Sequence, residues 1–243
     1  MPITSPSFAV VIPMFNEEQG AARCIDAVCS VLSQQAERCQ LIVVEDGSKD
    51  KTKEILKALE SSHTNLTVVL HERNQGYGRA LVTGAQRAAQ DGFDYALFMD
   101  SDLTNDPTDI PKFVEQMKRN IDVIKATRYS DGGKIQGVPF FRVAISRVGN
   151  LVAGALFRLP LFDCTNGFRA VKVGLLNTIT LQENNFSIIM EELYRLKPLA
   201  QSYARIPVTL TDRAADLRGT SFRYKPSIFW DYLKYPLWSF LGI

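Results

Sequence analysis

Short apolar runs alternate with helical patterns through the first half of the chain, and this alternation constrains the fold more than any other feature of the sequence. Between the runs, apolar residues recur at helical spacing, as at Ile25, Val28 and Leu32. A strand–helix repeat of roughly 25 to 30 residues predicts βαβ units, so we expect an α/β fold with a mostly parallel central sheet flanked by helices. The runs with the length and composition of buried strands are residues 8–12, 41–44, 67–70 and 95–99.

Polar residues indicate where the first two helices begin. Asn16 precedes the first helical pattern and Gln19 stands three residues further on, which predicts a capping box. Asp50 stands in a similar place before the second helical pattern, so we expect it to cap that helix.

The second half of the chain is less regular. There we expect strands at residues 122–127 and 205–211, and helices at 140–157 and 186–196. No Pro-, Gly- or Ser-rich linker divides the sequence. Residues 1–226 are therefore expected to form one domain, with residues 227–243 as an appended segment.

Acidic or amide side chains follow three of the predicted strands. They are Asn16 and Glu17, Glu45 and Asp46, and Asp100 and Asp102. The carboxyl ends of parallel strands meet at one edge of a sheet, and ligands of such sheets bind there. One acidic strand end would mean little, whereas three at one edge predict a site.

Asp100 and Asp102 give the sharpest of these signals. Alternate residues at a strand end point to the same side, so their carboxylates can converge on one hard cation. We expect Mg²⁺ or Mn²⁺, which would take its other ligands from water and substrate phosphates. Such an ion would neutralise a diphosphate leaving group. The alternative is a solvated acidic turn that caps the next helix.

Two other strand ends suit a nucleotide. Asp46 could accept hydrogen bonds from a base or a ribose, although Asp46, Gly47 and Ser48 also have the composition of a plain tight turn. Residues 74–78, with the sequence NQGYG, form a glycine loop before a helix, where a phosphate can approach the backbone. An ordinary connection between strand and helix explains that loop equally well.

Arginines gather in the second half, whereas the net charge of +2 gives the chain no overall field that would attract nucleic acid. A guanidinium binds phosphate through two parallel hydrogen bonds, so converging arginines suit a phosphorylated acceptor or a diphosphate. For each single arginine, a solvated surface position is the alternative. The candidates are Arg128, Arg142, Arg147, Arg169, Arg213, Arg218 and Arg223.

The last residues, 227–243, are rich in aromatic and aliphatic side chains and contain only two charged residues, Asp231 and Lys234. They predict either a helix packed on the core or a segment at a membrane interface, with tryptophan and tyrosine at headgroup depth. No uncharged run of 18 residues occurs, so we expect no membrane-spanning helix.

Seven segments carry a specific order of motifs: VVIPMFNEE, IVVEDGSKDKT, RNQGYGRALVTG, FMDSDLTNDP, ATRYSDGGKI, DCTNGFRA and VTLTDRAADLRGTSF. In this order they resemble glycosyltransferase family 2, which has the GT-A fold. Within that family the sequence is most similar to the dolichyl-phosphate mannosyltransferase and polyprenyl-phosphate glycosyltransferase group. The resemblance covers residues 8–224. The QxxRW motif of processive members is missing, which argues against a polysaccharide synthase.

The resemblance implies roles for individual residues, with Asp100 and Asp102 as metal ligands and Arg128 beside them as the third catalytic residue. The residues implied to contact the nucleotide-sugar are Pro13, Phe15, Glu17, Asp46, Asp100, Ser101 and Asp102. Those implied to contact an acceptor phosphate are Arg128, Arg142, Arg169, and Arg213 or Arg218, between which the longer arginine loop of this chain leaves the choice open.

Some positions depart from the family pattern. Phe15 stands where relatives often have tyrosine, so a hydroxyl contact is lost there. Glu45 replaces the first aspartate of the usual DDGS. Thr104 stands where a third metal ligand is often found. Glu191 matches a glutamate that members of the family have on this helix.

The implied activity is inverting transfer of a sugar from a nucleotide-sugar, either GDP-mannose or a UDP-sugar, to a polyprenyl phosphate of the dolichyl or undecaprenyl type. A lipid phosphate with a second pKa of about 6 is largely ionised at neutral pH, so it can attack without a general base. A sugar hydroxyl would need one. The implied location is the cytoplasmic side of a membrane, where the protein would be peripheral or anchored by a segment outside this sequence.

Two alternatives remain open. One is a family 2 transferase that acts on a hydroxyl acceptor in glycan or cell-surface polysaccharide synthesis. The other is a nucleotide-binding module without transferase chemistry, which predicts a G-x-G-x-x-G motif after the first strand, where PMFNEEQG supplies none.

Overall fold

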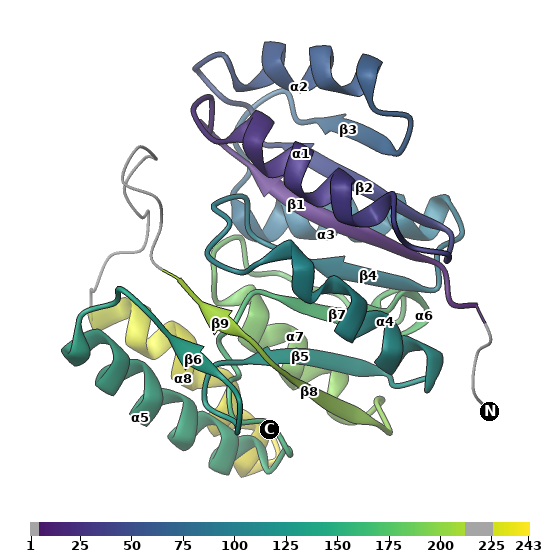
Figure 1. Ribbon diagram of the computed structural model, residues 1–243. Helices are drawn as coiled ribbons and strands as arrows, with labels where there is room; N and C mark the ends of the chain where they lie inside the picture. Colours follow the sequence, from purple (N-terminus) through teal and green to yellow (C-terminus); the bar gives the residue numbers. More distant parts are fainter. Residues whose placement is uncertain (1–4, 212–225) are drawn as a thin grey trace.

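A seven-stranded sheet with the order β3-β2-β1-β4-β7-β5-β8 forms the centre of the protein (Figure 1). The structure is a computed structural model and describes residues 5–211 and 226–243. Neighbouring strands are parallel except where β7 pairs with β4 and with β5. The expected mostly parallel α/β sheet is therefore confirmed. Its strands are β1 (Phe8–Met14), β2 (Cys39–Glu45), β3 (Leu66–Leu70), β4 (Tyr95–Phe98), β5 (Val123–Thr127), β7 (Arg169–Lys172) and β8 (Tyr203–Pro207).

Helices cover both faces of the sheet, because alternate residues of each strand point to opposite sides. Phe8, Val10 and Ile12 of β1 pack in one core with α1, α2 and α4, whereas Ala9 and Val11 pack in a second core with α3 and α7. A small sheet of β6 (Lys134–Ile135) and β9 (Thr209–Leu210) lies apart from the main one. The helices are α1 (Ala21–Leu32), α2 (Thr52–Ser62), α3 (Tyr77–Gln90), α4 (Ile110–Lys118), α5 (Phe140–Phe157), α6 (Val173–Leu176), α7 (Ile188–Leu196) and α8 (Pro226–Leu241).

The beginning of the chain departs from the predicted caps. α1 begins only at Ala21, and Asn16 adopts a φ of 54° with its Oδ1 accepting the N–H of Lys49. The predicted capping box is therefore wrong, because Asn16 binds the neighbouring loop instead of a helix. The prediction for the second helix is confirmed in part: the cap residue of α2 is Lys51, but Oδ1 of Asp50, one residue earlier, accepts the N–H of Thr52, the first residue of the helix.

Strand limits also differ in places. β1 continues through Pro13 to Met14, beyond the predicted end. β4 pairs with β1 only as far as Val11, so the proline, which cannot donate to a ladder, has β2 alone as its neighbour. The strand expected at 205–211 is divided into β8 and β9. β7 was not predicted, because this short strand has charged residues, Arg169 and Lys172, at both ends.

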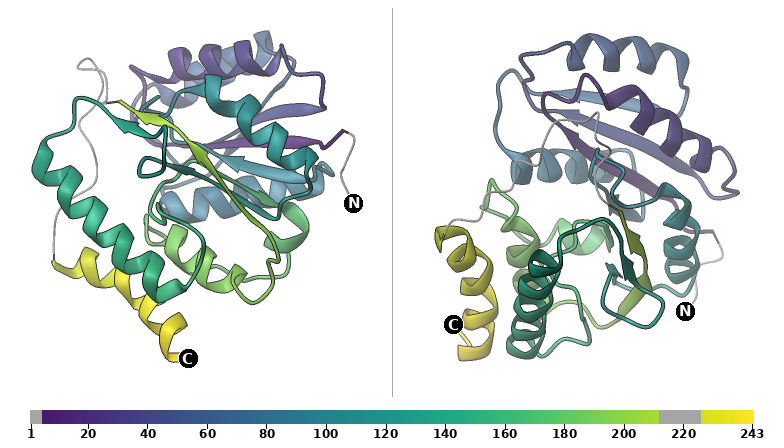
Figure 2. Two further views of the ribbon diagram at one scale, coloured as in Figure 1. Left: turned by 60° about the horizontal axis from the view of Figure 1, so that its bottom comes forward. Right: turned by 60° about the vertical axis from the view of Figure 1, so that its left-hand side comes forward.

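Helices α5 and α8 pack side by side at one edge of the molecule (Figure 2). α8 turns Tyr235 and Trp238 inward, and both rings contact Tyr194 of α7. Both helices expose large apolar side chains, which are Phe140, Phe141, Ile145, Val148, Leu151 and Val152 of α5 and Phe229, Trp230, Phe240 and Leu241 of α8. α8 is therefore both a packed helix and an exposed apolar one, and the domain division after residue 226 stays a prediction.

Among the helices of the described chain, α5 alone is long and apolar enough to cross a membrane, with a mean hydropathy of 1.4 over 18 residues. The α5 helix contains Arg142 and Arg147 and so is not an uncharged run; the expectation that this chain has no membrane-spanning helix stays a prediction.

The packing of α3 on the sheet can be tested at Gly84, where a Cβ would lie 2.2 Å from Cγ1 of Val11. We expect Gly84→Ala to lower the free energy of unfolding by about 1–3 kcal/mol, as overpacking of a core does. Gly149→Ala in α5 is the matched control, because a Cβ there meets nothing within 4 Å. That variant should gain about 0.5–1 kcal/mol from its better helix propensity. Urea denaturation measures both, and a Gly84→Ala variant as stable as the wild type would contradict the packing.

Candidate active site

Hydrogen bonds join the loops that follow β1 and β2, so these two strand ends form one rim. The N–H of Asn16 donates to Ser48 Oγ at 2.9 Å, and the N–H of Glu17 donates to Thr52 Oγ1 at 2.8 Å. Hydroxyl groups of one loop thus fix the backbone of the other. The loop that carries Phe15 and Glu17, both half-buried, is held at the carboxyl edge of the sheet.

Asp46 follows β2 at this edge, and its carboxylate is buried and fully hydrogen-bonded. Oδ1 accepts from Nδ1 of His71 at 2.7 Å and from the N–H of Gln75 at 2.9 Å. Oδ2 accepts from Nδ2 of Asn74 and from the N–H of Gly76, both at 2.9 Å. A carboxylate offers about four acceptor sites, which these donors fill. Asp46 therefore anchors the glycine loop, and the nucleoside contact expected of it would require one of these bonds to break.

His71 is a residue of this edge that sequence reasoning missed. It directly follows β3, and its Nε2 lies 2.9 Å from Oγ1 of Thr83 on α3. The imidazole therefore connects the Asp46 carboxylate to a helix. Its position just after a predicted strand could have identified it, because that is where the acidic residues of the site also stand.

Asp100 is connected to Asp46 through two consecutive residues. The hydroxyl of Tyr77 donates to Asp100 Oδ1 at 2.9 Å, and the preceding residue, Gly76, binds Asp46. Burial and, after it, the charge of Asp100 raise the pKa of Tyr77, so the hydroxyl remains a protonated donor. Gly167 closes the other side, since a Cβ there would lie 2.9 Å from Asp100 Oδ2. The predicted meeting of acidic strand ends at one edge is thus present.

Asp102 lies in a turn. β4 ends at Phe98, so Asp100 and Asp102 are not alternate residues of a strand, and that part of the prediction is wrong. Oδ1 of Asp102 accepts from the N–H of Thr104 at 3.1 Å and from its Oγ1 at 2.8 Å, so Thr104 orients this carboxylate. Burial and then the charges of Asp102, Glu17 and Asp100 raise the pKa of the Cys24 thiol, which indicates that these carboxylates surround one end of α1.

The side chains at this edge fit a cation that is bound jointly with a substrate better than one that the protein alone would enclose. Within residues 5–211 and 226–243, no group of three or more His, Cys, Asp or Glu side chains could hold a metal ion. Mg²⁺ needs only one or two protein carboxylates when substrate phosphates and waters complete its ligands. Asp100 and Asp102 match that requirement, so they fit an ion that arrives with a phosphorylated substrate.

Arg169 is buried beneath this edge. Its Nε and Nη2 pair with Glu192 of α7 at 2.6 and 2.7 Å, and its Nη1 donates to the carbonyl of Gly167 at 2.9 Å. The guanidinium also lies 4.3 Å from the ring centre of Phe98. With 0% exposure, Arg169 has no surface for an acceptor phosphate, so the geometry does not support that expected role. It holds Gly167 against Asp100 instead.

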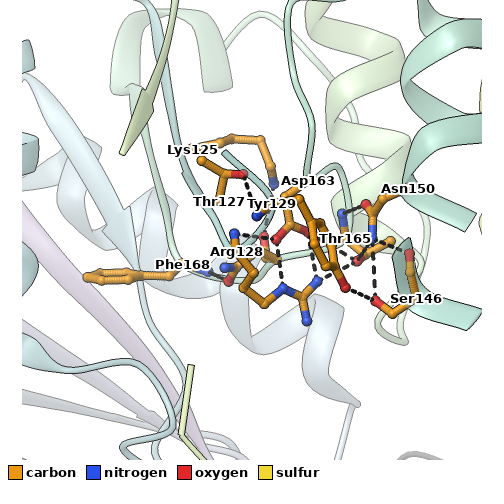
Figure 3. A network of polar contacts seen from close by, with 10 residues as sticks. Lys125, Thr127, Arg128, Tyr129, Ser146, Asn150, Asp163, Thr165 and Phe168 are labelled. Carbon is orange, nitrogen blue, oxygen red and sulfur yellow. Dashed lines mark hydrogen bonds and ion pairs between the residues drawn. The ribbon is translucent and has the colours of Figure 1, made fainter. Parts of the chain in front are cut away.

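Arg128, which follows β5, occupies a more open position (Figure 3). Its Nε and Nη2 form a fork on Asp163, with both distances 2.7 Å, and Nη2 also lies 3.1 Å from Thr165 Oγ1. The Arg128 side chain is 14% exposed, whereas the Asp163 side chain is fully buried, with 0% exposed. Nη1 takes no part in this fork. The carboxylate therefore holds the arginine in one orientation at the surface of the edge.

The other expected phosphate-binding arginines fall in two groups. Arg142 lies half-buried in the first turn of α5. Arg213 and Arg218 lie outside the described residues. The last described residue before them, Thr211, donates its N–H to the carbonyl of Thr104 at 3.0 Å, next to the Asp102 turn.

The remaining expected residues take these places. Pro13 is buried within β1, and Ser101 is half-buried between the two aspartates. Glu191 is buried and its Oε2 accepts the N–H groups of Gln182 and Glu183, both at 2.8 Å. This glutamate therefore caps a loop rather than pointing to solvent.

Several partners could not be identified from the sequence. Asp163 and Glu192 pair with arginines from other elements, and no local pattern indicates such pairing. Tyr232 of α8 also approaches the site: burial and then Asp100 raise the pKa of its hydroxyl, whereas Arg128 lowers it. Tyr232 of α8 thus lies within electrostatic range of both the aspartate and the arginine.

Similar solved structures support the fold. Glucosyl-3-phosphoglycerate synthase from Mycobacterium tuberculosis, in complex with phosphoglyceric acid, gives a TM-score of 0.67 at 22% identity over 98% of this chain and 81% of that one. The same enzyme in complex with Mn²⁺, uridine diphosphate and glucosyl-3-phosphoglycerate gives a TM-score of 0.64 at 23% identity. The expected GT-A fold is confirmed.

Relatives in sequence extend over most of the chain. A dolichol-phosphate mannosyltransferase from Pyrococcus furiosus is 30% identical over 231 residues, which are 93% of this chain and 62% of that protein. This chain thus spans less than two thirds of the length of that relative. A polyprenol monophosphomannose synthase from Mycolicibacterium smegmatis is 24% identical over 88% of this chain and 82% of its own length. The family model for glycosyl transferase family 2 matches residues 9–180, so the chain belongs to glycosyltransferase family 2.

Proposed function

We propose that this protein transfers a sugar from a nucleotide-sugar, GDP-mannose or a UDP-sugar, to a polyprenyl phosphate at a membrane surface. The observation that carries the proposal is the carboxyl edge of the sheet, where hydrogen bonds link Asp46 through Gly76 and Tyr77 to Asp100 and where Arg128 follows β5, held by Asp163. The two relatives named above are a dolichol-phosphate mannosyltransferase and a polyprenol monophosphomannose synthase, and similar solved structures contain uridine diphosphate with Mn²⁺ or Mg²⁺.

The donor would lie across the carboxyl edge of β2, β1 and β4. In this proposal Phe15 and Glu17 face the nucleoside, with Thr52 holding the backbone of Glu17, and Asp46 anchors the glycine loop. Asp100 and Asp102 would hold Mg²⁺ or Mn²⁺, which when bound neutralises the diphosphate as it leaves. Ser101, between the two aspartates, would face the same diphosphate.

The acceptor chemistry follows from the surroundings of Arg128. One oxygen of the lipid phosphate forms a bond to the anomeric carbon as the bond from that carbon to the diphosphate oxygen breaks, and the nucleoside diphosphate leaves. A hydroxyl acceptor would need a base to take its proton. Asp163, the carboxylate beside Arg128, is buried and both its oxygens accept hydrogen bonds from the guanidinium, so it is a poor base. This favours an acceptor that is already ionised.

The apolar face of α5 and α8 supports a lipid surface as the place of reaction. Phe140 is 85% exposed and Leu151 is 72% exposed, and α5 has Arg142 and Arg147 but no acidic residue. An apolar face with cations beside it suits an anionic bilayer surface. We therefore include a membrane surface among the partners and place the protein at the cytoplasmic side.

The proposal is tested by nucleotide release from GDP-mannose and a panel of UDP-sugars, with Mg²⁺ or Mn²⁺, in the presence and absence of a short polyprenyl phosphate. We expect release that depends on both the cation and the lipid phosphate. Asp102→Asn should reduce it by at least roughly 100-fold, since removal of one charge-stabilising group costs that order of rate. Turnover that needs a sugar hydroxyl and ignores lipid phosphate would select the hydroxyl-acceptor alternative. A near-normal rate for Asp102→Asn would reject the metal assignment.

Tyr77→Phe tests how Asp100 is oriented. The ring should keep its contact with Phe186, at a centroid distance of 4.5 Å, while the hydroxyl bond to Asp100 is lost. A neutral hydrogen bond to a charged acceptor is worth about 1.5–3 kcal/mol. We expect the Mn²⁺ concentration for half-maximal rate to rise several-fold. Tyr95→Phe, whose hydroxyl donates to the carbonyl of Ile121, is the control and should leave that concentration unchanged. Equal metal requirements for wild type and Tyr77→Phe would refute the contact's role.

Leu151→Asp tests the membrane face. A charge at this exposed position of α5 should cost no folding energy but should weaken binding to vesicles of phosphatidylglycerol and phosphatidylcholine several-fold. Leu199→Asp is the control, because Leu199 is 42% exposed and belongs to neither α5 nor α8. Cosedimentation measures both variants. Unchanged binding of Leu151→Asp would remove α5 from the lipid contact.

A further inference from the structure

The inner side of α5 contains a buried amide, that of Asn150. Asn150 is 1% exposed. Its Oδ1 accepts the N–H of Thr165 at 3.1 Å, and its Nδ2 donates to Thr165 Oγ1 at 3.0 Å and to the carbonyl of Ser146 at 2.9 Å. The amide and the threonine thus hold each other at two points. A buried polar group without such partners would be destabilising, so these bonds fix how α5 sits on the protein.

The same threonine contacts the candidate acceptor arginine. Thr165 Oγ1 accepts from Nη2 of Arg128 at 3.1 Å, and Asp163, two residues earlier, forms the fork on that guanidinium. A second route runs beside the first, because the hydroxyl of Tyr129 donates to Ser146 Oγ on α5 at 2.8 Å. Figure 3 shows these side chains in one continuous network from the end of β5 to α5.

Directional bonds of this kind accomplish what apolar packing alone would not. Burial of apolar surface holds a helix near a sheet without fixing its rotation or its shift along the axis. Hydrogen bonds lose strength steeply with distance and angle, so the bonds that join Thr165 to the Arg128 guanidinium and Tyr129, the next residue, to Ser146 restrain both the rotation and the shift of α5. The apolar side of α5 and the Arg128 side chain are therefore kept in a constant relation.

We propose that Asn150, Thr165 and Asp163 are positioning residues that set Arg128 at a fixed depth relative to the lipid-facing side of α5. A phosphate headgroup at the surface on which α5 rests then meets the guanidinium without further adjustment of the protein. This inference rests on the proposed function, because it concerns the same acceptor site.

The test uses Thr165→Val, which removes the hydroxyl at nearly constant shape, and Thr165→Ser, which restores it. We expect Thr165→Val to lower kcat/KM for a long-chain polyprenyl phosphate in vesicles by roughly 10-fold, the factor that corresponds to one lost hydrogen bond to a charged group. The KM for the nucleotide-sugar should not change. A short-chain polyprenyl phosphate in solution, which can adjust to a displaced arginine, should lose no more than about 2-fold. Thr165→Ser should recover both values.

Thr178→Val is the matched control, because Thr178 Oγ1 donates only to the carbonyl of Leu175 and lies apart from the network. Tyr129→Phe removes the hydrogen bond to Ser146 and replaces Thr165→Val in the test if that variant does not fold. It should show the same preference for the soluble acceptor. Equal losses on both acceptors, a full rate for Thr165→Val in vesicles, or no recovery in Thr165→Ser would each overturn the inference. A wild type that uses neither lipid phosphate fails the proposed function instead, so the two failures are distinguishable.

Discussion

Two adjacent backbone N–H groups, those of Gln75 and Gly76, depend on the Asp46 carboxylate for their acceptors. Because that carboxylate is buried, loss of either bond would leave polar groups without water to replace them. The loop can make both bonds only because residue 76 is glycine: its φ is 96°, and a Cβ would lie 2.6 Å from the carbonyl of Asn184. Tyr77 then starts α3 with its hydroxyl on Asp100. One loop therefore binds the carboxylates of both acidic strand ends.

Two arginine–carboxylate pairs of similar geometry differ in what surrounds them. Arg169 and Glu192 lie in the core, where breaking a pair leaves an uncompensated charge and costs about 3–5 kcal/mol. Burial and, after it, the charge of Arg169 also lower the pKa of the neighbouring Lys125 to about 8. Arg128 and Asp163 lie at the rim, with the arginine partly exposed. The same chemistry thus stabilises the fold at one position and leaves a cation partly exposed at the other, where the proposed acceptor would bind.

The sequence predicted the elements and the edge of the site because both follow from local patterns. Apolar runs identify strands buried on two faces, and polar residues after them must lie where parallel strands end. Which carboxylate pairs with a buried arginine, in contrast, does not follow from the residues near it in the sequence. Nothing near Arg169 in the sequence indicates that Glu192 of another helix would cover it, and a single-sequence match therefore gave it the same role as Arg128. The positive φ of Asn16 was likewise decided by Lys49 and the loop after β2.

Hydropathy alone would allow α5 to cross a bilayer, but its polar bonds argue for a different placement. Asn150 and Ser146 lie midway along the helix, and both bind residues of the α/β domain. Insertion across a membrane would break these bonds and move Asn150, Arg142 and Arg147 into hydrocarbon, where each polar group is costly. Lying flat keeps the bonds and still buries the exposed apolar side. The polar inner side of α5 thus supports the proposed contact, in which its apolar outer side would meet lipid as a surface.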